Sequence, residues 1–243
     1  MAISDLTERQ KRLLCDVVEE FIEEAEPIGS KRLVERCGLD ISPATVRNEM
    51  ARLIEEGLLD KPHASAGRFP TTMGFRFYIN ELMEENELPV IEEVSLKQRL
   101  WPHRFSAADL WYETANALAD STKGLSIVLA KERVFSSGAV NVLDHPEFFD
   151  IDVTKTALHL LDHPELLEEL FDRAELSEGV HTLVGAELGL THLEPCGLVF
   201  SPIELREGYG VVGVLGPNRM EYYKVIPRVR YVSGLLRELG KEW

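Results

Sequence analysis

The sequence predicts a two-part α+β protein, in which helices and a hairpin precede a domain of mixed helices and strands. In the first 84 residues, apolar side chains recur at helical spacing and are followed by two short extended segments. After residue 106, apolar segments of strand length alternate with helical patterns. The length of 243 residues, with 44% hydrophobic and 28% charged side chains, is that of a globular protein of one or two domains.

Two helices are predicted first. Residues 6–25 carry apolar side chains at i, i+3, i+4 spacing, and Thr7 with Gln10 has the spacing of a capping box. A short helix over residues 31–36 follows, with Ser30 as its expected N-cap and Gly38 at its end.

The third predicted helix carries the features most relevant to function. It begins with Ser42 as N-cap and Pro43 in the first helical position, and it ends before Gly57. One face is apolar, and the opposite face carries small and polar side chains, with Asn48 and Arg52 among them. A helix that enters the major groove of DNA needs such a face, because small residues allow close approach and Asn and Arg can bind base edges.

Two short extended segments, residues 58–62 and 68–71, flank a tip of mostly small residues at 63–67 and predict a wing. Three helices followed by a wing form a winged helix-turn-helix, which is a DNA-binding architecture. Units of the same shape also serve as protein-interaction modules, and the pattern alone leaves that alternative open.

The net charge of −16 argues against DNA binding only until its distribution is considered. Residues 29–80 contain eight basic and six acidic side chains, whereas residues 16–26 contain six acidic and no basic ones. The acidic residues therefore lie mainly outside the predicted contact surface. The expected base contacts come from the third helix: Ser42, Thr45, Arg47, Asn48 and Arg52. The expected contacts with the DNA backbone are Ser30, Lys31, Arg32, Lys61, His63, Ser65 and Arg68, although a solvated His63 fits the sequence equally well.

The predicted domains are residues 1–84, a linker over 85–105, and a second domain over 106–243. Residues 84–101 are acidic and contain Pro89, which predicts an exit helix followed by a linker. Beyond it, we expect helices at 107–121, 154–161, 165–175 and 228–239, and strands at 125–130, 181–184, 196–201 and 210–215.

Other motifs favour structural roles. Residues 208–213 match G-x-G-x-x-G, but they lie in an apolar strand and lack the acidic residue of a dinucleotide site. The string Asp-His-Pro-Glu at 144–147 and 162–165 suggests a metal, yet an N-cap Asp before a helix explains it better. The cysteines Cys15, Cys37 and Cys196 are far apart, and they favour a reducing compartment, the cytoplasm. We find no catalytic constellation, cofactor motif or metal site, and no apolar run long enough to span a membrane.

A close family resemblance covers residues 6 to about 82. The chain resembles the heat-inducible transcription repressor HrcA at residues 6–10 (LTERQ), 27–31 (PIGSK), 42–50 (SPATVRNEM), 56–59 (EGLL) and 62–71 (PHASAGRFPT). The second domain resembles HrcA at 138–143 (GAVNVL), 146–148 (PEF), 213–222 (GVLGPNRMEY) and 225–227 (VIP). The resemblance implies a GAF-like second domain and a repressor of heat-shock chaperone genes. It also implies a homodimer on an inverted-repeat operator of double-stranded DNA, with chaperonin as a regulatory partner.

The chain departs from the family in length. Members carry further strands and an inserted dimerisation subdomain where only a few residues separate Ala130 from Phe135 here. We therefore expect a reduced GAF-like domain without that subdomain. An alternative is a regulator that senses a small molecule through its GAF-like domain.

Overall fold

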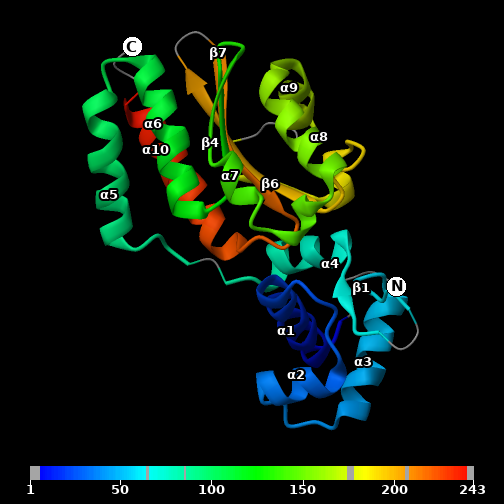
Figure 1. Cartoon of the computed structure of the whole chain (residues 1–243). Helices are drawn as coiled ribbons and strands as arrows, with labels where there is room; N and C mark the ends of the chain where they lie inside the picture. The colour runs from blue at the N-terminus through cyan, green and yellow to red at the C-terminus, as the bar shows by residue number, and fades with distance from the viewer. Residues whose placement is uncertain (1–5, 64–65, 85, 174–177, 206–207, 240–243) are drawn as a thin grey trace. The chain divides into compact units, whose positions relative to one another are not determined.

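The chain forms two compact units, Met1–Glu84 and Glu85–Trp243, which are described separately (Figure 1). The computed structural model describes residues 6–63, 66–84, 86–173, 178–205 and 208–239. It is a mixed helical and sheet protein, so the predicted α+β class is confirmed.

The first unit begins with helix α1, Glu8–Glu24. The predicted capping box is present: Thr7 is the N-cap, its side chain accepts from the Gln10 backbone, and the Gln10 side chain accepts from the Thr7 backbone. Ala25 ends the helix in the left-handed conformation, with φ 58°.

Helix α2, Ser30–Cys37, begins one residue earlier than expected. Gly29 is its N-cap, so the prediction that Ser30 caps this helix was wrong. Ser30 is instead the first helical residue, and it is buried. Gly38 ends the helix at φ +59°, a conformation that favours glycine.

Helix α3, Pro43–Glu55, begins at the predicted N-cap, Ser42. Strands β1, Leu59–Asp60, and β2, Phe69–Pro70, follow it and pair antiparallel, with Leu59 opposite Pro70. Helix α4, Thr72–Phe77, continues into the π-helical turn η2, Tyr78–Leu82. The element order is that expected of a winged helix-turn-helix. Fully buried side chains from every helix fill its core, among them Leu14, Val17, Leu33, Met50, Leu53 and Phe75.

The second unit is built on one five-stranded antiparallel sheet with the order β4-β3-β7-β6-β5. Its strands are β3 (Leu125–Ala130), β4 (Arg133–Ser137), β5 (His181–Val184), β6 (Cys196–Leu205) and β7 (Gly208–Pro217). The four expected strands are present, and β6 and β7 run longer than expected. The G-x-G-x-x-G string lies in β7, as the structural interpretation required. Strand β4 is an addition to the prediction.

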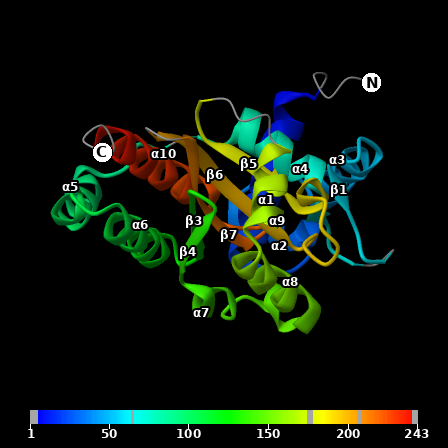
Figure 2. The same cartoon turned by 90° about the horizontal axis from the view of Figure 1, so that it is seen from above.

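Helices cover both faces of this sheet (Figure 2). On one face lie α6 (Ala107–Thr122) and α10 (Tyr222–Leu239), with α5 (Val90–Leu100) beside α6. On the other face lie α8 (Ile151–Asp162) and α9 (Pro164–Asp172), whose Leu160, Leu167 and Phe171 pack with Ile127 and Phe200 of the sheet. The short helices are η3 (Trp101–His103), α7 (Ala139–Val142), η4 (Pro146–Phe149) and η5 (Gly185–Leu188).

Three local predictions in this unit were wrong. Residues 85–105 are not simply a linker, because α5 and η3 lie there and bury Leu96 and Leu100. Helix α10 begins at Tyr222 and contains Pro227, which was expected to precede it. In both Asp-His-Pro-Glu strings the histidine, His145 or His163, occupies the N-cap, in place of the expected aspartate.

Candidate nucleic-acid interface

The start of α3 is fixed by its own cap. The Ser42 Oγ accepts from the Thr45 backbone N–H at 3.2 Å and lies 3.0 Å from the Thr45 Oγ1. Pro43 in the first turn has a fixed φ that suits a helix, and it lacks an N–H that would be unsatisfied there. These capping contacts therefore stabilise the first turn of α3, from which the following side chains project.

Helix α3 separates an apolar face from an exposed polar face. Val46, Met50 and Leu53 are fully buried against the core. The opposite face exposes Arg47, Asn48 and Arg52, together with the small side chains of Ala44 and Ala51, while Thr45 is half-buried. One rigid helix thus carries all five predicted base-contacting residues, counting Ser42 at its cap. Asn and Arg can each make paired hydrogen bonds to a purine in the major groove.

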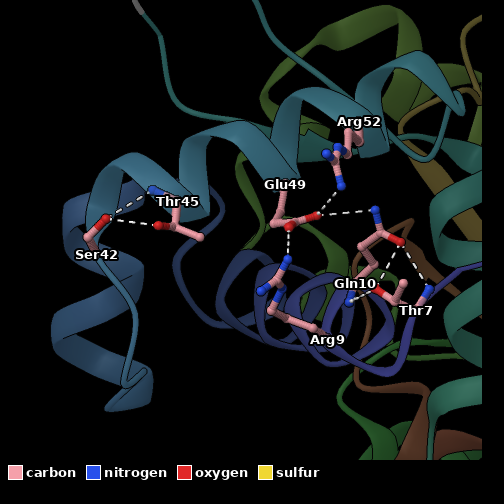
Figure 3. A network of polar contacts seen from close by, with 7 residues as sticks. All are labelled: Thr7, Arg9, Gln10, Ser42, Thr45, Glu49 and Arg52. Atoms are coloured by element: carbon pink, nitrogen blue, oxygen red, sulfur yellow. Dashed lines mark hydrogen bonds and ion pairs between the residues drawn. The ribbon is translucent and has the colours of Figure 1, made fainter.

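Glu49 is a polar member of the inward face that the sequence analysis did not identify (Figure 3). Its side chain is 5% exposed and forms ion pairs with Arg9 of α1 and Arg52 of α3. Gln10 Nε2 donates to the Glu49 Oε2 at 3.2 Å. The spacing of Glu49 and Arg52 by three residues was visible in the sequence, but the contacts with α1 are long-range. Figure 3 shows the three partners converging on the carboxylate.

The predicted backbone contacts on α2 differ in accessibility. Lys31 is exposed, whereas Ser30 is 7% exposed. Arg32 pairs with Glu24 of α1 at 2.8 Å, so part of its charge is already neutralised. Hydrogen bonds from Arg32 and then Arg36 lower the pKa of the Glu24 carboxyl below its usual value. The acidic side of α1 and the basic side of α2 therefore compensate each other.

The hairpin presents two of its predicted contacts to solvent. Lys61 and His63 are exposed, and Arg68 is half-buried, with its Nη1 donating to the Ala66 carbonyl at 2.8 Å. Ser65, a further predicted contact, lies outside the described residues. The hairpin, which follows α3 in the chain, therefore offers Lys61 and His63 to solvent.

The described part of the chain holds no candidate metal site, because its His, Cys, Asp and Glu side chains form no group of three or more that could hold a metal ion. Burial raises the pKa of the Cys196 thiol to about 12, with Glu147 and Glu194 contributing. None of the described helices is long and apolar enough to cross a membrane.

The first unit has the element order expected of a helix-turn-helix protein, and α3 presents an exposed polar face. Residues 73–226 match the family model described as the HrcA protein C-terminal domain. The chain belongs to the HrcA family.

Relatives named heat-inducible transcription repressor HrcA align over nearly the whole chain. The protein of Carboxydothermus hydrogenoformans is 26% identical over 336 aligned residues, covering 96% of this chain and 98% of that one. The protein of Desulforudis audaxviator is 28% identical over 341 aligned residues, with 97% and 98% covered. Because both alignments are longer than the 243 residues of this chain, they contain gaps within it.

A crystal structure described as that of a hypothetical protein superposes with a TM-score of 0.82 at 19% identity. The superposition covers 98% of this chain and 99% of the other. This likeness supports the fold.

Proposed function

We propose that this chain is a sequence-specific DNA-binding repressor of heat-shock chaperone genes. The observation that carries the proposal is the exposed face of α3, where Arg47, Asn48 and Arg52 stand among small residues on a firmly capped helix. That face fits the major groove, where Asn and Arg discriminate between bases. The heat-inducible repression in this proposal rests on the names of the relatives.

In this proposal, α3 lies in the major groove and contacts bases through Ser42, Thr45, Arg47, Asn48 and Arg52. The backbone contacts come from Ser30, Lys31 and Arg32 at the start of α2, and from Lys61, His63, Ser65 and Arg68 of the hairpin. The exposed Lys31 and Lys61 are the strongest of these candidates, because Ser30 is buried and Arg32 is already paired.

The repressor acts as a homodimer in the cytoplasm. The acidic remainder of the protein repels DNA, so a single contact surface binds weakly and in a salt-sensitive way. Two copies on an inverted repeat place two recognition helices on the same face of the duplex, which raises both affinity and sequence choice. Chaperonin is the proposed regulatory partner, on the strength of the family resemblance.

Footprinting on the upstream regions of chaperone genes from the source genome tests the proposal. We expect protection of an inverted repeat, and we expect added chaperonin to strengthen it. A matched probe with one half-site scrambled should lose most of the protection. If no inverted repeat is protected at low salt, the proposal is wrong.

A further inference from the structure

The polar cluster around Glu49 differs from an ordinary surface ion pair in the burial of its members. The Glu49 side chain is 5% exposed, whereas those of Arg9 and Arg52 are 55% and 64% exposed. The anion is thus inaccessible to DNA, while both cations keep most of their surface in solvent. Surface arginines of this kind are the side chains that bind phosphates without regard to sequence.

Glu49 is held in place from α1. Gln10 donates to it through Nε2, and the Gln10 Oε1 accepts from the Thr7 backbone N–H at 2.9 Å and from the Thr7 Oγ1 at 3.0 Å. Hydrogen bonds therefore link the capping box of α1 to the Glu49 carboxylate on α3, as Figure 3 shows. These bonds fix the position of the carboxylate that pairs with Arg9 and Arg52.

The two guanidinium groups differ in how they meet the carboxylate. Arg9 donates to the Glu49 Oε1, whereas the Arg52 Nη1 lies 3.6 Å from the Glu49 Oε2, too far for a hydrogen bond. Arg52 is therefore oriented by electrostatic attraction to Glu49, without a direct hydrogen bond to it. It lies one helical turn after Asn48, on the face that we propose contacts bases.

We propose that Glu49 is a positioning residue that sets sequence specificity, and that Arg9 is a further DNA contact outside the recognition helix. The inference rests on the proposed function. The buried carboxylate pairs with Arg9 and Arg52 and offsets one of their two positive charges. It thereby limits how strongly they bind phosphates of any sequence, and it keeps Arg52 directed at the groove.

Neutralising Glu49 should therefore strengthen non-specific binding, an effect that loss of folding does not produce. We compare Glu49→Gln with Glu55→Gln, which makes the same charge change at an exposed position of the same helix. The probes are a duplex with the footprinted inverted repeat and a scrambled duplex of equal length and composition. For Glu49→Gln we expect about tenfold tighter binding of the scrambled duplex. The slope of log affinity against log salt concentration should become steeper by about one unit, the value of one phosphate contact. The ratio of the two affinities should fall about tenfold, whereas Glu55→Gln should leave that ratio within about twofold.

A second pair of variants keeps the test independent of Glu49. Arg9→Gln should weaken binding of both duplexes by about threefold to tenfold and flatten the salt dependence by about one contact. Arg12→Gln removes the same charge from an exposed position one turn further along α1 and should have a smaller effect.

The outcomes are distinguishable. If the unmodified protein prefers the inverted repeat but Glu49→Gln and Glu55→Gln behave alike, the role of Glu49 is wrong and the proposed function stands. A folded Glu49→Gln protein that binds both duplexes more weakly also overturns that role. Equal effects of Arg9→Gln and Arg12→Gln overturn the contact by Arg9. If the unmodified protein binds both duplexes equally, the proposed function fails, and this inference fails with it.

Discussion

Ile28 and Arg68 exchange both of their backbone hydrogen bonds, although they lie far apart in the sequence. The Ile28 N–H donates to the Arg68 carbonyl at 2.8 Å, and the Arg68 N–H donates to the Ile28 carbonyl at 2.9 Å. The bridge fastens the segment between α1 and α2 to the base of the hairpin. It thereby fixes the hairpin relative to the helices that we propose bind DNA.

Gly67 is required for this bridge. A Cβ at position 67 would meet the Pro27 carbonyl oxygen at 2.3 Å, so Gly67→Ala must push the hairpin away. We expect a loss of about 2 kcal/mol in the free energy of unfolding, as for other overpacked sites. Urea denaturation measures it. At Gly29, where a Cβ meets nothing within 4 Å, the same change should cost at most about 1 kcal/mol, mainly through the cap of α2. Equal losses at the two positions would contradict this account.

Asn48 should determine sequence choice. The Asn48→Ala variant loses an exposed amide that can pair with a base, and nothing in the core changes. We expect about 1–3 kcal/mol less discrimination at one base pair of each half-site, with unchanged thermal stability. Binding to duplexes mutated singly at each position measures this. A variant that keeps the full sequence preference would show that α3 is docked differently.

Lys31 should contribute equally to the binding of every DNA sequence. Its exposed ammonium lies in the first turn of α2, where the amide groups of the helix N-terminus also favour phosphate. In Lys31→Ala we expect weaker binding of every duplex and a salt dependence flatter by about one unit. Titrations at several salt concentrations measure both. A change confined to one sequence would contradict a role in backbone contact.

The turn between β3 and β4 carries conformational strain that a substitution can relieve. Lys131 and Glu132 form the turn with φ 52° and 61°, values that favour glycine or asparagine. We expect Glu132→Gly to raise the free energy of unfolding by about 1 kcal/mol. Glu132→Ala removes the same side chain but keeps the Cβ, and it should bring no such gain in thermal unfolding. Equal behaviour of the two variants would show that strain at position 132 is unimportant.

The three cysteines should react slowly with thiol reagents in the folded protein. Burial, followed by the charge of a nearby acid, raises the pKa of Cys15 to about 12 and that of Cys37 to about 11, and burial raises that of Cys196 to about 12. A raised pKa favours the protonated thiol, so at pH 8 roughly one part in ten thousand of a thiol of pKa 12 is thiolate. Labelling should accelerate strongly in denaturant. Rapid labelling of the native protein at pH 8 would contradict these environments.

Local capping chemistry explains which elements the sequence predicts well. Thr7 with Gln10, and Ser42 with Pro43, act within one helical turn, and both helices begin where these residues place them. The apolar run at 125–130 gives strand β3 with the predicted ends. The exposed face of α3 follows from the same helical period that predicts its buried face.

Long-range contacts explain the differences. The place of helix α5 in the second unit depends on distant partners: the Arg228 Nη2 donates to Glu92, and the Tyr231 hydroxyl donates to the Glu93 carbonyl. Strand β4 contains polar and charged residues, and its pairing with β3 defines it. The burial of Glu49 likewise depends on Arg9 and Gln10, which belong to another helix.

The β3–β4 turn also makes the second unit modular. Because Ala130 and Arg133 are paired neighbours on adjacent strands, the chain leaves and re-enters the sheet at almost the same point. A folded segment whose own ends lie close together can be spliced into such a turn while the flanking strands stay paired. The turn residues Lys131 and Glu132 are thus a site for domain insertion. A dimerisation module or a reporter domain can be introduced there without redesigning the sheet.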